Sequence, residues 1–185
     1  PTLSHRLRLL AKILLQFYIG MGQYNGKSGD VFVRTVENSH RIANIGVHFF
    51  DMLMWVFGKC KTYKVHNYSH DRASGVLELE KANVRWFLGI NSEFLPKKAV
   101  AENKTTYRSI KVNGKEIEFS GGFTDLHTKS YENILNKKGF SISDCRNAIE
   151  ITHALRTSEI SPLKGDYHPL SKFPDIPHPF EHEEY

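Results

Sequence analysis

The chain has 185 residues, of which 40% are hydrophobic, 12% aromatic and 24% charged. These proportions are typical of a folded globular domain and exclude a largely disordered chain. The formal net charge of +5 comes from basic residues spread along the sequence. Because no stretch concentrates them, the charge does not indicate a nucleic-acid-binding surface.

The chain contains two cysteines, Cys60 and Cys145, outside any metal-binding spacing. They indicate neither a disulfide framework nor a zinc site, so we expect a cytoplasmic protein. The apolar stretch within residues 4–17 is interrupted by basic residues, and the second, residues 42–57, is too short for a bilayer. We therefore expect no membrane partner.

The first 42 residues are the least informative part of the sequence. Residues 3–17 predict an amphipathic helix, since leucines recur at spacings of three and four: Leu3, Leu7, Leu10 and Leu14. Residues 18–41 show no sustained period. We treat residues 1–42 as a separate N-terminal segment.

Residues 42–57, which are apolar nearly all round, predict a buried helix, and Gly58 fits its left-handed C-cap. Three runs rich in β-branched and aromatic residues then predict successive antiparallel strands: 62–70, 74–80 and 83–90. In the second run leucines alternate with glutamates, which predicts one buried and one solvated face. Such a sheet needs helices on one side only.

Asn113-Gly114 is flanked by two further strand-like runs and predicts a hairpin. Thr124 fits the cap of a helix over 124–136, and Asp144 that of a helix over 145–156. The proline- and histidine-rich tail, residues 161–185, is expected to be extended and to wrap the body or a neighbouring subunit. The prediction for residues 43–160 is an α+β domain with an open, mostly antiparallel sheet and helices on one face.

The helix over 42–57 carries the main chemical candidate. Asn44, His48 and Asp51 are spaced so that a helix brings them together on one face. Buried polar groups without partners cost about 1 to 3 kcal/mol each, so the three either satisfy one another or face a site. On spacing alone, a hydrogen-bonded core histidine is the commoner outcome.

A second candidate is the glycine turn Gly121-Gly122, followed by Thr124, Asp125 and His127. The start of a helix offers free amides and a favourable dipole to a diphosphate or carboxylate. We therefore predict Thr124 and His127 as substrate contacts. The alternative is an ordinary capped helix start.

The remaining histidines and aromatic residues suggest no further site. The histidines occupy a strand region and a proline-broken tail, so no metal geometry follows, and hydrogen-bonded or solvated roles are expected: His66, His70, His168, His178 and His182. The aromatic residues of the strands are expected in the core or at an interface: Tyr63, Tyr68, Trp86 and Phe87.

Residues 43–58, ANIGVHFFDMLMWVFG, resemble the D/N-x-G-x-H-x-x-D helix of the substrate domain in Gfo/Idh/MocA oxidoreductases. The resemblance extends through residues 70–91, 107–135 and the LKGDYHPL of 163–170. These segments are similar to the branch that oxidises the 3-hydroxyl of UDP-N-acetyl-2-amino-2-deoxy-glucuronate. The resemblance implies a C-terminal, substrate-binding domain.

In that family the helix histidine works with a lysine of the dinucleotide-binding domain as the acid/base pair for hydride transfer. The resemblance therefore implies that His48 moves the proton, that Asn44 orients the site, and that Asp51 is either a compensating acid or a structural acceptor. It also implies NAD as cofactor, a UDP-sugar acid as substrate in polysaccharide biosynthesis, and a homo-oligomer, dimer or tetramer, formed through the sheet.

No strand-GxGxxG-helix unit occurs in the sequence, so the dinucleotide-binding half is expected to be missing. We hypothesise a partial chain from a truncated or frameshifted reading frame, inactive as a dehydrogenase alone. The alternative function is a catalytically silent oligomerisation module.

Overall fold

The structure is a computed structural model that describes residues 29–36, 42–120, 126–139 and 141–176. The predicted helix over 3–17 and the predicted cap Thr124 lie outside these residues. Of the described helices, none is long and apolar enough to cross a membrane.

A six-stranded sheet forms the body, in the order β2-β3-β4-β1-β5-β6. Only β1 and β4 pair in parallel, and the other four neighbouring pairs are antiparallel, which confirms the predicted open, mostly antiparallel sheet. The bounds are β1 Gly29–Val36, β2 Cys60–Tyr68, β3 Arg72–Leu79, β4 Ala82–Gly89, β5 Tyr107–Val112 and β6 Lys115–Glu118.

Strand β1 extends the domain beyond its predicted start at residue 43. It lies inside the sheet, with Val31 paired to Val84 of β4 on one side and to Val112 of β5 on the other. The boundary therefore moves to residue 29. Sequence reasoning missed this strand because glycines precede it and its hydrophobic run is short.

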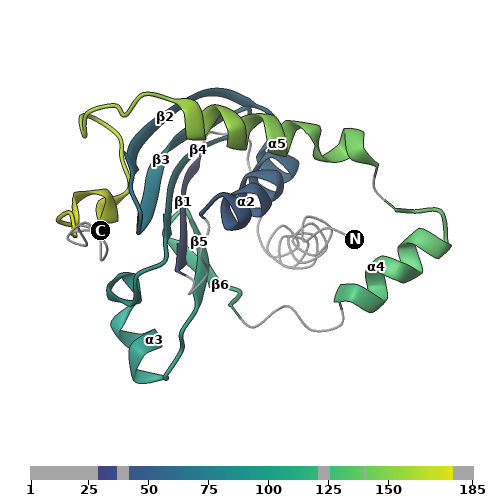
Figure 1. Cartoon of the computed structure of the whole chain (residues 1–185), viewed down its shortest axis with the longest axis horizontal. Coiled ribbons are helices and arrows are strands. Elements are labelled where there is room, and N and C mark those ends of the chain that lie inside the picture. Colours follow the sequence, from purple (N-terminus) through teal and green to yellow (C-terminus); the bar gives the residue numbers. More distant parts are fainter. Residues whose placement is uncertain (1–28, 37–41, 121–125, 140, 177–185) are drawn as a thin grey trace, which may run out of the picture.

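Two helices cover one face of the sheet, as predicted (Figure 1). They are α2, Ile42–Phe57, over the central strands and α5, Ile142–Thr157, beside it. Helix α4, Leu126–Leu135, lies apart from the sheet, and the short α3, Lys97–Ala101, follows the 3-10 turn η1, Ser92–Phe94.

The N-cap of α5 is Ser141, which corrects the predicted cap Asp144. Asp144 is instead the third helical residue, and its carboxylate accepts hydrogen bonds of 2.7 and 2.8 Å from the amide and hydroxyl of Ser141. This is the capping-box arrangement, in which the cap and the third residue support each other.

The core lies between the sheet and the two helices. Leu77 and Leu79 of β3 are 1% and 2% exposed, whereas Glu78 and Glu80 are exposed, so the predicted alternation is confirmed. The other main contributors come from α2, β4 and α5: Phe49, Phe50, Leu53, Phe57, Val84, Trp86, Leu88, Ile151 and Leu155.

Two turns have the predicted backbone geometry. Gly58 ends α2 with a φ of 85°, and its amide donates to the carbonyl of Met54. Asn113 and Gly114 have φ values of 50° and 81°, which is the left-handed pair required by a two-residue hairpin turn.

The tail crosses the sheet on the side away from α2 and α5 (Figure 1). Ile160 forms a parallel bridge to Val65 at the β2 edge, and residues 169–172 form the 3-10 turn η2, Pro169–Lys172. The prediction that the tail wraps the body is thus confirmed for its described part. We call residues 160–175 the C-terminal strap.

Candidate functional site

The polar stripe of α2 points away from the sheet. An α-helix turns by about 100° per residue. Measured as rotation about the helix axis from Gly46, Phe50 and Phe57 lie within about 40°, on the same side of the helix as Gly46. Positions 44, 48 and 51 lie roughly 140° to 200° from Gly46, on the opposite side. Gly46 faces β4, because a Cβ atom added there would lie 3.0 Å from Cδ1 of Leu88. The stripe is therefore on the outer face of the layer of helices.

His48 and Asp51 share this outer face without being fully solvated. His48 is half-buried, with its Nδ1 atom buried, and Asp51 is only 3% exposed. A carboxylate buried in this way has a stronger electrostatic influence on its surroundings than an exposed one, because water screens it less. One turn further along, Trp55 is 43% exposed and marks where the surface of the helix opens to solvent.

Helix α2 therefore places an imidazole, a group that can transfer protons, on a face that is partly open to solvent. A histidine can donate or accept a proton near neutral pH, and a placed one contributes about a hundred- to ten-thousand-fold as a general acid or base. Asn44 belongs to α2 by its backbone, at the position one turn before His48; its side chain lies outside the described residues.

The structure does not join the second predicted cluster to this stripe. Gly121, Gly122, Thr124 and Asp125 lie outside the described residues. His127 falls in the first turn of α4 by its backbone, and its side chain is likewise outside them. Figure 1 shows α4 well apart from α2, so α4 and the α2 stripe do not form one site in this arrangement.

A cavity of about 260 Å³ lies between α2, α5 and the start of β2. Its lining residues are Met54, Lys59, Cys60, Asn147, Glu150, Ile151 and Ala154. The pKa of the Cys60 thiol is raised to about 11, mainly by burial and to a smaller extent by the nearby Glu78 carboxylate. The thiol therefore stays protonated at neutral pH and is no nucleophile.

Within the described residues, no group of three His, Cys, Asp or Glu side chains could hold a metal ion. His66, which is 3% exposed, has ring nitrogens 3.2 and 3.1 Å from the carbonyl oxygens of Ser161 and Asp166. His168 is 6% exposed, and its Nδ1 accepts from the amide of Leu170. Both are hydrogen-bonded interior histidines, as predicted.

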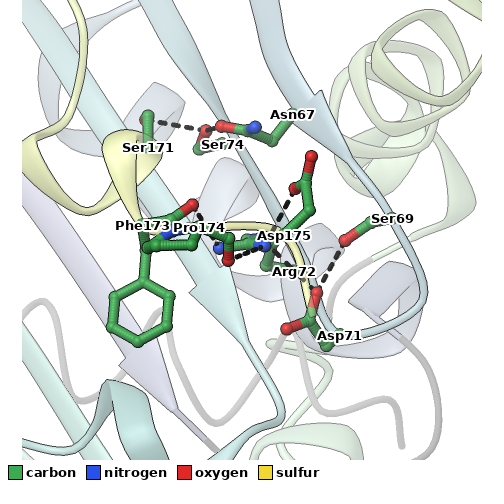
Figure 2. Close-up of polar contacts among 9 residues, drawn as sticks. All are labelled: Asn67, Ser69, Asp71, Arg72, Ser74, Ser171, Phe173, Pro174 and Asp175. Atoms are coloured by element: carbon green, nitrogen blue, oxygen red, sulfur yellow. Dashed lines mark hydrogen bonds and ion pairs between the residues drawn. The ribbon is translucent and has the colours of Figure 1, made fainter. Parts of the chain in front are cut away.

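A polar network missed by sequence reasoning attaches the C-terminal strap to the opposite face of the sheet (Figure 2). Arg72 is 0% exposed, and its two terminal nitrogens donate to the carbonyls of Phe173 (2.9 Å) and Pro174 (2.7 Å). Asp175 and Asp71 lie 3.0 and 3.4 Å from the same guanidinium. The charge is thereby compensated where water cannot reach it.

Three further contacts extend this network. The Ser171 hydroxyl donates to Ser74, and Ser74 donates to Asn67, both over 2.8 Å. Arg85 forms an ion pair with Asp166. The signal that could have revealed the network is Asp71-Arg72 at the start of a strand that is otherwise largely apolar, because a charged residue there requires buried partners.

Comparison with solved structures gives two strong matches, both to the WlbA (WbpB) dehydrogenase from Thermus thermophilus. The complex with NAD and α-ketoglutarate has 36% sequence identity and a TM-score of 0.75, over 85% of this chain and 56% of that one. The complex with NAD and UDP-GlcNAcA has 34% identity and a TM-score of 0.78, over 91% and 59%.

This chain therefore spans less than two thirds of the length of the dehydrogenase that it matches. No family model matches the sequence.

Proposed function

We propose that this α+β domain is the substrate half of an NAD-dependent oxidoreductase of the Gfo/Idh/MocA type, which its similarity to the WlbA (WbpB) dehydrogenase supports. The substrate is a UDP-N-acetylhexosaminuronate oxidised at its 3-hydroxyl. The identity of 34% to a dehydrogenase solved with NAD and UDP-GlcNAcA supports this substrate class. The single structural observation that carries the proposal is the placement of His48 on the outer face of α2.

In this proposal His48 accepts the proton of the sugar 3-hydroxyl. NAD, bound by a dinucleotide-binding domain, would supply the hydride acceptor, so that the carbinol would become a ketone while its hydroxyl proton goes to the His48 imidazole. Asp51 stabilises the imidazolium that forms, because a buried carboxylate on the same helix face favours the charged ring. Asn44, one turn earlier, orients the sugar.

The cofactor has no binding place among the described residues, since none of them forms a glycine-rich strand-turn-helix unit. In this proposal helix α2 provides the proton-transfer group, and cofactor binding belongs to another domain. We therefore expect no NADH formation from UDP-GlcNAcA and NAD with this chain alone; NADH formation would contradict this division of roles.

We also propose self-association through the sheet face opposite α2 and α5. Beyond the strap this face presents exposed polar side chains from four strands: Thr62, Lys64, Glu78, Asn83 and Lys111. Complementary charges on such a face support a polar, salt-sensitive interface. Light scattering after size exclusion should show a dimer or tetramer at low salt, and a monomer at all salt concentrations would contradict it.

The substrate assignment is tested by a thermal-shift panel with UDP-GlcNAcA, UDP-GlcNAc and NAD. A ligand that binds only the folded chain raises its melting temperature. UDP-GlcNAcA should stabilise the chain more than UDP-GlcNAc, which lacks the carboxylate, and NAD should have no effect. If neither nucleotide sugar stabilises the chain, the silent oligomerisation module becomes the better account.

A further inference from the structure

The C-terminal strap contacts two buried histidines whose hydrogen-bond partners favour opposite protonation states. His66 lies at the β2 edge, where residues 161–166 of the strap cover it, and His168 lies in the strap itself, above Phe87 of β4. They are 3% and 6% exposed, so water does not replace their protein partners. Their partners therefore decide which form of each ring fits.

Both partners of His66 are acceptors. Nδ1 lies 3.2 Å from the Ser161 carbonyl oxygen and Nε2 lies 3.1 Å from the Asp166 carbonyl oxygen. A neutral imidazole has one N–H and one lone pair, so it can donate to only one of these carbonyls. The imidazolium has two N–H groups and satisfies both.

The partner of His168 is a donor. The Leu170 amide donates to Nδ1 over 3.2 Å, as the cap of the turn η2. Nδ1 can accept only when it carries no proton, so the imidazolium would turn this contact into a clash of two donors. The ring also stacks on Phe87, with centroids 5.5 Å apart, which keeps it in this orientation.

The charged groups around each ring are already engaged with other partners. Near His66 the strap presents Asp166, whose carboxylate pairs with Arg85 of β4, and Tyr167, whose ring has the Lys172 ammonium 5.1 Å from its centroid. Near His168, the charged group of the aromatic cluster around Phe87 is Arg72 of β3, with its partners Asp71 and Asp175.

From these contacts we propose that the strap is a pH-responsive cover whose two halves loosen in opposite directions. Residues 160–166 are held best on the acid side, where His66 donates twice. Residues 168–173 are held best on the alkaline side, where His168 accepts. The strap is attached along its whole length only between these limits.

Hydrogen exchange at pH 5.5, 7 and 8.5, corrected for the intrinsic rate at each pH, tests this on the full chain. Protection of the Ser161 amide, which donates to Val65, should fall roughly two- to ten-fold toward pH 8.5, the worth of one hydrogen bond. Protection of the Leu170, Ser171 and Phe173 amides should fall by a similar factor toward pH 5.5.

Two variants act as matched controls. His66→Gln keeps two N–H groups without titrating, so it should abolish only the alkaline loosening. His168→Asn keeps an acceptor for the turn amide, so it should abolish only the acid loosening. Protection that does not depend on pH in the wild-type chain, or pH responses that persist in both variants, would overturn the proposal.

A second measurement keeps the test valid if a variant fails to fold. The ring ¹⁵N shifts of the wild-type chain report the protonation of each histidine directly. At pH 6, with the strap bound, His66 should show two protonated nitrogens and His168 an unprotonated Nδ1. A single protonated nitrogen on His66 whenever the strap is bound would overturn the proposal.

Discussion

Gly75 of β3 occupies a position where no side chain fits. A Cβ atom there would lie 2.1 Å from the Lys64 carbonyl oxygen and 2.9 Å from the Trp86 ring. Because the first contact is with backbone, the neighbouring strand itself must move. We expect Gly75→Ala to lower the free energy of unfolding by about 3 kcal/mol, measured by urea denaturation.

Gly114→Ala is the control for this substitution. Gly114 has a φ of 81°, and a Cβ atom added there would have no other atom within 4 Å, so only backbone strain of about 1 to 2 kcal/mol is expected. Equal losses for the two variants would show that the contact between β2 and β3 is looser than described.

Cys60 gives a pH prediction. Burial and Glu78 raise the pKa of its thiol to about 11, so about a thousandth of the folded protein carries the thiolate at pH 8. Ellman's reagent should label it slowly at pH 8 in the native chain and quickly in urea. Because the folded state holds the proton more tightly, this group's contribution to stability is present below about pH 9 and is lost as the pH rises toward 11.

Glu78→Gln is the matched variant, since it removes the charge and keeps the shape. Its thiol pKa should be lower and its native labelling faster than in the wild type. Labelling at an unchanged rate would mean that burial alone protects the thiol.

At the residue scale, the sequence predicts the placement of side chains that follow the helical or strand period. It does not predict buried side chains whose hydrogen-bond partners lie far away in the chain. His48 and Asp51 could be placed on one helix face because helical spacing is local. Arg72 could not be placed in a buried network, since its acceptors, Phe173 and Pro174, lie about a hundred residues away in the chain. Nothing near Arg72 in sequence specifies them.

At the element scale, the strap depends on Arg72 more than on any acidic partner. Arg72→Ala should cost about 3 to 5 kcal/mol of unfolding free energy, because it leaves the Phe173 and Pro174 carbonyls without their donor and Asp71 without its ion-pair partner. Asp175→Ala should cost less than about 1 kcal/mol, since the Asp175 side chain is 92% exposed. Urea denaturation of both variants measures the difference.

Arg72→Lys separates charge from geometry, because lysine cannot reach two carbonyls in the fork arrangement. It should lose most of the stability that Arg72→Ala loses. A stability equal to wild type would show that charge alone attaches the strap.

Among the elements, those with strong local signals were predicted and the central strand β1 was not. The α2 helix has a continuous apolar pattern and a glycine cap, and the β5–β6 hairpin has Asn113-Gly114 at its turn. Strand β1 owes its place to pairing with β4 and β5, which are about 50 and 75 residues further along the chain. Because this pairing depends on residues elsewhere in the chain, the eight residues of β1 carry only a weak strand pattern of their own.

At the scale of the whole molecule, the two faces of the sheet have separate roles. One face carries α2, which presents His48 outward, and the other carries the C-terminal strap (Figure 1). A change in the strap should therefore alter stability or association before it alters proton transfer. The fold could be predicted as α+β from sequence, whereas this division of faces needed the structure.

The role of His48 is tested most directly by supplying a dinucleotide-binding domain. The chain is joined to the dinucleotide-binding domain of the Thermus thermophilus WlbA dehydrogenase, and NADH formation from UDP-GlcNAcA is measured for wild type and His48→Asn. We expect turnover by the wild-type fusion and a kcat about a hundred- to ten-thousand-fold lower in the variant, with KM little changed. Equal turnover by the two fusions would contradict this role of His48.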